Sequence, residues 1–234
     1  MTSPLPILNV VGLARAREAE LIMDVDSVGA HQALGAICTL LFDVEGVRSH
    51  FKIASQIAPR NVNVLNNYSV SLHQLGFFSE AFEYANTVAE LVPEDLRALR
   101  QARDNAFFAG DLNNARLLDE MHAFRGGKED DDACTIGDVI KSLGKSGVAQ
   151  SELATGQRLM FDLLRERKVR FKSIEFGVTE ADGDTAVAYT VRIRASLNDA
   201  IELGDELAVQ LSDQIADWHP WALVFDFIGQ GAGD

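Results

Sequence analysis

Two prolines, Pro59 and Pro93, lie 34 residues apart, and each ends an apolar segment with helical spacing. Residues of similar type or size recur at the same spacing: Gly35 and Ser69; Leu41, Leu75 and Ala109; Val44, Phe78 and Leu112; Val47, Ala81 and Ala115; Gly76 and Gly110. A fixed period of about 20 to 50 residues marks a repeat architecture, in which each unit buries its apolar face against the next. The period therefore predicts stacked helical units in the N-terminal half.

The best-defined unit is Val62–Asp95, which we expect to form two antiparallel helices. Ser69 is small, so it allows the paired helices to approach closely. Gly76 suits a left-handed backbone at the end of the first helix, because it has no Cβ. Ser79 is the predicted N-cap of the second helix, and Pro93 stops that helix.

This pattern resembles the tetratricopeptide repeat, on the residues Leu65, Tyr68, Ser69, Leu72, Gly76, Phe78, Ala81, Tyr84 and Pro93. The flanking units Val28–Asn61 and Leu96–Glu129 match less well. In the first of them Phe42 replaces the turn glycine. In the last, Arg103 replaces the small residue and Gly127 the final proline, as a capping repeat allows.

The resemblance implies a concave groove lined by the first helix of each unit, which binds a partner peptide or helix. Amide side chains would pair with a peptide backbone, arginine with a carboxylate, and apolar groups would form a pocket. The groove residues that the resemblance implies are Gln32, Thr39, Asn66, Val70, His73, Gln74, Arg97, Arg100, Asp104 and Phe107.

The predicted fold class is α+β with two domains. An N-terminal segment, 1–27, precedes an all-α repeat domain over 28–126. Residues 127–134 contain glycine and a run of acidic side chains, which repel one another and predict a linker. The remainder, 135–234, is predicted as a small sheet with helices on one face.

Within this second domain, Thr135 and Ser196 each precede a segment with helical periodicity, and a longer helix is predicted over Ser151–Lys168. Alternating apolar residues on both sides of the acidic turn 180–184 predict a β-hairpin. The run Trp221–Ile228 predicts a closing strand.

Composition narrows the function classes. The net charge of −14 argues against nucleic-acid binding, which depends on clustered cations. No apolar run approaches the roughly 20 residues that span a bilayer, and no cationic segment precedes the apolar N-terminus. These features predict a protein without a membrane association. Two cysteines in a chain of this size are expected to be reduced, which predicts a cytoplasmic location.

No glycine-rich phosphate loop, nucleophile elbow or histidine pair at metal-ligand spacing occurs, so no cofactor, metal or catalytic residue is predicted. The leading hypothesis is a protein-interaction adaptor rather than an enzyme, with a homo-oligomer forming through the C-terminal domain. One alternative is a secretion chaperone of the tetratricopeptide type. Another is an enzyme whose site lies in the C-terminal domain near His219 and the acidic hairpin.

Overall fold

The computed structural model describes residues 15–128, 134–181, 184–216 and 218–230. The chain divides into two compact units, Met1–Ala98 and Leu99–Asp234. The linker that the sequence predicted at 127–134 lies mostly outside the described residues. Helices fill the N-terminal part and a three-stranded sheet with further helices follows, so the α+β fold class is confirmed.

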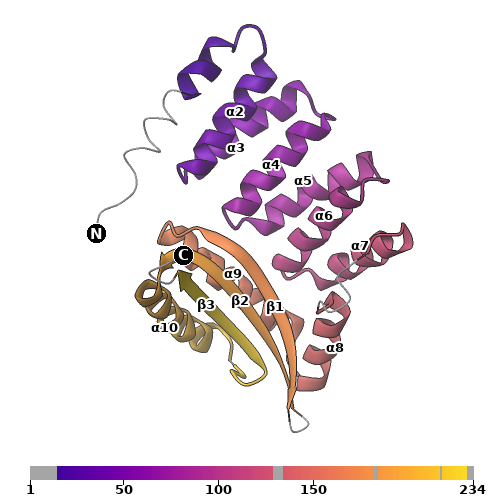
Figure 1. Cartoon of the computed structure of the whole chain (residues 1–234), viewed down its shortest axis with the longest axis vertical. Coiled ribbons are helices and arrows are strands. Elements are labelled where there is room, and N and C mark those ends of the chain that lie inside the picture. The colour runs from indigo at the N-terminus through magenta and orange to yellow at the C-terminus, as the bar shows by residue number, and fades with distance from the viewer. Residues whose placement is uncertain (1–14, 129–133, 182–183, 217, 231–234) are drawn as a thin grey trace. The chain divides into compact units, whose positions relative to one another are not determined.

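The helices repeat with the period that the sequence predicted. The second helix of each pair begins at Val44, Phe78 and Leu112, and the first ends at Leu40, Gln74 and Phe108, always 34 residues apart. Adjacent helices pack against each other in a helical-repeat arrangement. The six helices are α2 (Ser27–Leu40), α3 (Val44–Ile57), α4 (Val62–Gln74), α5 (Phe78–Leu91), α6 (Leu96–Phe108) and α7 (Leu112–Phe124) (Figure 1).

The turn inside each pair also repeats. Gly76 and Gly110 adopt φ of 76° and 78°, the left-handed region that glycine enters without a Cβ penalty. Phe42, which replaces glycine in the first pair, adopts the same backbone conformation at φ 56°. Its ring packs against the core of the first unit, so apolar burial offsets the cost of that conformation.

The predicted N-cap at Ser79 is wrong. Helix α5 begins at Phe78, and its N-cap is Phe77, which makes no side-chain capping hydrogen bond. Asp43 and Asp111 hold the equivalent position in the other pairs, and their carboxylates accept hydrogen bonds from Gly46 N and Asn114 N. The tight turn places Ser79 inside the helix, two positions too late to cap it.

The core of the first unit lies between α3, α4 and α5. The stacked rings of Phe51 and Tyr68 form its centre, with centroids 5.1 Å apart. The Ser69 hydroxyl donates to Ala81 O at 2.8 Å, so this small residue does bring the two helices of the pair together. The buried core residues are Val47, Phe51, Tyr68, Leu72, Leu75 and Ala81.

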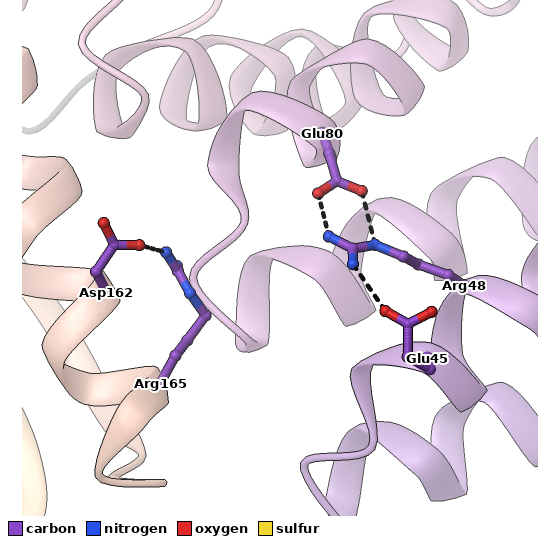
Figure 2. A network of polar contacts seen from close by, with 5 residues as sticks. All are labelled: Glu45, Arg48, Glu80, Asp162 and Arg165. Atoms are coloured by element: carbon purple, nitrogen blue, oxygen red, sulfur yellow. Dashed lines mark hydrogen bonds and ion pairs between the residues drawn. The ribbon is translucent and has the colours of Figure 1, made fainter.

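An arginine joins the first two helical pairs. Figure 2 shows Arg48 of α3 directing two nitrogens to the carboxylate of Glu80 on α5 and a third to Glu45. The guanidinium also lies 4.8 Å from the centroid of the Phe77 ring. A two-pronged ion pair of this kind fixes orientation as well as distance. The same figure includes an ion pair within a helix of the second unit, between Arg165 and Asp162.

Two histidines meet across the first pair. Nδ1 of His31 on α2 lies 3.0 Å from Nδ1 of His50 on α3. One nitrogen must therefore donate and the other accept. Burial lowers the pKa of His50 and the charge of His31 lowers it further, against the opposing effect of Asp43. A second proton would place two donors head-on and break the contact.

Acidification from about pH 7.5 to about pH 5.5 should therefore destabilise the first unit. Because the pKa of His50 in the folded chain lies below the unfolded value of about 6.5, the unfolded state binds more protons as the pH falls, and stability is lost. Urea unfolding followed by far-UV circular dichroism should show a smaller loss for His50→Asn than for the unsubstituted chain. An equal loss in both would contradict this role of the pair.

The second unit continues with α8 (Ile136–Ser146), α9 (Gln150–Glu166), β1 (Phe171–Ala181), β2 (Asp184–Ser196), α10 (Leu197–Gln214) and β3 (Leu223–Gln230). Thr135 and Ser196 form capping boxes at the start of α8 and α10, as their positions in the sequence suggest. The strands lie in the order β1-β2-β3 (Figure 1). The predicted hairpin β1–β2 is antiparallel, whereas β3 returns through α10 to pair parallel with β2.

Burial alternates along β2. Val187, Tyr189 and Val191 are buried, while Arg192 and Arg194 on the other face are exposed. The register places Phe176 of β1 and Phe225 of β3 beside Tyr189, so one face carries an aromatic row. Helices α8, α9 and α10 pack on the sheet, in agreement with the predicted layer of helices on one face.

Candidate functional site

A pocket of about 250 Å³ opens in the second unit. Helix α6 forms one wall, because residues three or four apart share a helix face and Arg100, Asp104 and Phe107 follow that spacing. Helix α7, the start of α8 and strand β1 complete the pocket. Its lining residues are Arg100, Arg103, Asp104, Phe107, Phe108, His122, Lys128, Cys134, Ile136 and Phe176.

The pocket is rich in positive charge. Arg103 is only 14% exposed, and it pairs with Asp104 at 3.0 Å and with Asp119 of α7 at 2.9 Å. Arg100 and Lys128 make no ion pair with any residue that the structure describes. Both are exposed at the rim. Among the described residues, no carboxylate neutralises these two cations of the pocket lining.

His122 lies inside the pocket wall and is 2% exposed. Burial lowers its pKa, and the charges of Arg103 and Arg100 lower it further, which outweighs the opposing effect of the nearby carboxylates. The imidazole is therefore neutral near pH 7. A Cβ on Gly127 would overlap the ring, so this glycine allows the chain to pass close to His122.

Cys134 also lines the pocket and is half-buried. Burial raises the pKa of its thiol, and the negative charge of Asp138 raises it further. The neutral thiol therefore dominates at neutral pH, and a thiol is a weak nucleophile compared with a thiolate. Within the described ranges, no three His, Cys, Asp or Glu side chains gather as a metal site would require.

The floor of the pocket is aromatic. Phe107 is 2% exposed, and its ring centroid lies 4.5 Å from that of Phe176 on β1 and 6.5 Å from that of Tyr189 on β2. Phe107 therefore connects α6 to the sheet and is part of the core of the second unit.

The structure brings three of the ten predicted groove residues, Arg100, Asp104 and Phe107, into this pocket. Thr39 is 2% exposed and donates its hydroxyl hydrogen to Gly35 O, so it contributes to the α2 backbone and not to an open surface. Arg97 is largely exposed and pairs with Asp95.

Of the predicted groove residues on α2 and α4, Gln32 accepts a hydrogen bond from Asn67 at 2.9 Å across the two helices. The ring of His73 contacts that of Phe78. Gln74 is exposed, whereas Asn66 and Val70 are half-buried. These side chains do not line the pocket of the second unit.

The pocket residues that sequence reasoning missed are Arg103, Phe108, His122, Lys128, Cys134, Ile136 and Phe176. The sequence did contain one indication for Arg103. This residue stands where Gly35 and Ser69 stand in the other units, and a large cation at a position of close helix contact needs nearby groups that neutralise its charge. Phe108 adjoins Phe107 on the same helix, and the other five lie outside α6, so the tertiary fold alone brings them to the pocket.

The alternative enzyme hypothesis placed a site near His219 and the acidic hairpin, and the structure describes only part of that region. Nδ1 of His219 is buried and has no hydrogen-bond partner among the described residues, and its ring meets that of Trp221 edge-on. Glu180 pairs with Lys145 at 2.7 Å. Asp182 and Asp217 lie outside the described residues.

A scan of protein-family models finds none that matches the chain, and a search of curated proteins finds no match either. The helical-repeat arrangement is therefore established by the helix positions alone. No helix among the described residues has the length and apolar character needed to cross a membrane.

Proposed function

We propose that the chain is a protein-interaction adaptor built on repeats of the tetratricopeptide type, and that its pocket anchors part of a partner peptide. Arg100 and Lys128 receive a carboxylate of the partner, and the apolar surface of Phe108 and Ile136 receives a neighbouring side chain. One observation carries the proposal: a chain of net charge −14 gathers three cationic side chains over an aromatic floor.

The size of the pocket supports a peptide anchor. Pockets that enclose a whole small-molecule ligand typically measure about 300 to 1,000 Å³. At about 250 Å³ this pocket suits one or two side chains of a larger partner. The raised pKa of the Cys134 thiol favours a binding role over nucleophilic chemistry. A cytoplasmic location stays a prediction from the sequence.

Arg100→Glu should weaken the binding of selected peptides at least about tenfold, because a charge-assisted hydrogen bond contributes about 1.5–3 kcal/mol. The peptides would be selected from a random phage-displayed library on the full chain and measured by fluorescence anisotropy. They should carry an acidic residue next to an apolar one. Since the Arg100 side chain is exposed, the variant should fold normally.

Lys141→Glu is the matched control. It makes the same change of charge on the exposed surface of α8, away from the lining of the pocket. We expect it to leave the affinity within about twofold. Peptides that bind the Arg100→Glu variant as tightly as the unsubstituted chain would refute the pocket as the anchor.

A further inference from the structure

A run of basic residues crosses from the end of α9 into β1, and the structure divides it into two parts. On the helix side, Arg165 and Arg167 form ion pairs with carboxylates of α9 and α10. On the strand side, Arg170 and Lys172 flank the first residue of β1, which pairs with the end of β2 near Arg194. Lys172 and Arg194 are exposed and make no ion pair with any residue that the structure describes.

Arg170 and Arg194 lie directly opposite each other on the two strands. The register that pairs Phe171 with Ile193 continues outward to them, and Arg194 N donates to Arg170 O at 2.7 Å. Opposite side chains share one face of a sheet, here the face away from the buried residues of β2. Burial lowers the pKa of Arg170, and the charge of Arg194 lowers it further. The two guanidinium groups are therefore close enough to repel each other.

A third cation comes from an irregularity of β1. Phe171 pairs with Ile193 and Ser173 with Arg192, so β1 has one residue more than β2 over this step. The extra residue is Lys172, which makes the irregularity a β-bulge. Bulges change the direction of a side chain and are frequent next to functional sites. The bulge therefore places an exposed ammonium group beside the arginine pair.

This arrangement costs the free protein stability, because like charges directly opposite each other weaken a sheet. A local conflict of this kind is expected where function requires it. An oxyanion between the two guanidinium groups would replace the repulsion by two charge-assisted contacts, since each guanidinium presents a fork of N–H donors that matches an oxyanion.

We propose that Arg170, Lys172 and Arg194 bind the phosphoryl group of a phosphorylated side chain in a partner protein. A phosphoryl group carries about −1.5 to −2 charges near pH 7, so it can neutralise two arginines, whereas a carboxylate can neutralise only one. None of the three residues is part of the pocket lining given above, so the site goes beyond the proposed adaptor function and does not depend on it.

The surroundings favour a protein over a nucleic acid or a small molecule. The next positions on this face are the pairs Ser173 with Arg192 and Glu175 with Thr190, which offer no aromatic ring on which a base could stack. The net charge of −14 repels a long polyanion. Arg194 is exposed, whereas a small ligand is usually enclosed by its pocket. A single phosphorylated side chain on a larger partner satisfies all three conditions.

A degenerate peptide library with a fixed central phosphoserine tests the site. The immobilised full chain should retain this library at least about tenfold more than the same library with unmodified serine. Arg194→Gln should reduce retention to the level of the unmodified library. Because the Arg194 side chain is exposed, the variant should fold normally.

Urea unfolding followed by tryptophan fluorescence separates a binding role from a structural one. Without ligand, Arg194→Gln should raise the midpoint of unfolding, because it removes a like charge opposite Arg170. Inorganic phosphate at constant ionic strength should then raise the midpoint of the unsubstituted chain more than that of the variant. A variant with a lower midpoint in the absence of ligand would contradict the proposal.

Two control variants make the result specific. Arg60→Gln removes the same charge from an exposed position of the first unit, and Arg100→Glu changes the pocket; both should keep the phosphoserine library. The proposal would be overturned by equal retention of the two libraries, by retention that survives Arg194→Gln, or by an equal loss in either control. Retention of polyuridine RNA or phosphatidylserine vesicles in preference to the phosphoserine library would overturn it too.

Discussion

Phe107→Ala should lower the free energy of unfolding of the second unit by about 3–5 kcal/mol, the range for removing a buried phenylalanine. Phe107 is 2% exposed, and its ring contacts those of Phe176 and Tyr189 on the aromatic face of the sheet. Alanine would leave a cavity between α6 and both strands. Two tryptophans occur in the chain, Trp218 and Trp221, and both belong to the second unit. Urea unfolding followed by tryptophan fluorescence therefore reports on this unit.

Phe124→Ala is the natural comparison, because it removes the same side chain from a neighbouring helix of the repeat. With Phe124 92% exposed, the free energy of unfolding should change by no more than about 0.5 kcal/mol. If the two substitutions cost the same, Phe107 is not part of the core, and its prediction as a groove residue regains support.

Gly156→Ala should destabilise the second unit by about 1–3 kcal/mol, although alanine is the better helix former. A Cβ at this buried position of α9 would overlap the ring of Phe225 on β3. That ring cannot move freely, because it lies between Tyr189 and Trp218, with centroids 5.7 Å and 6.0 Å away. Overpacking thus outweighs the gain in helix propensity.

Gly204→Ala should change the stability of the second unit in the opposite direction. Gly204 lies within α10, and a Cβ there would meet no atom within 4 Å. The substitution should stabilise the unit by about 0.5–1 kcal/mol through backbone entropy alone. Chemical unfolding of both variants would decide the matter, and a stabilising Gly156→Ala would show that α9 and β3 are less tightly packed than the structure indicates.

The helical pairs were predictable because their signals are local. A proline stops a helix and a glycine turns one at fixed positions, so the spacing of Pro59 and Pro93, or of Gly76 and Gly110, reports the period directly. The cap at Ser79 failed for a local reason too: the turn is short, so the N-cap of α5 is Phe77, two residues before Ser79. The helix starts after Thr135 and Ser196 were predicted correctly, because serine or threonine with Asp three positions later satisfies the helix end by itself.

The candidate site was only partly predictable. Arg100, Asp104 and Phe107 share a face of one helix, which the periodicity indicates. No local sequence pattern indicates that Phe107 contacts a strand nearly seventy residues later, or that Lys128 and Cys134 line the same pocket. Those contacts depend on how α6, α7 and the sheet pack, and packing is a property of the tertiary structure.

The parallel pairing of β3 with β2 has a consequence for synthesis of the chain. The helices of the first unit contact their neighbours in sequence, so they can form on the ribosome soon after each pair emerges. The second unit lacks one edge of its sheet until Leu223–Gln230 have left the exit tunnel. During that interval Tyr189 and its neighbours on β2 have no β3 beside them, so an unpaired strand edge is open to association with other chains.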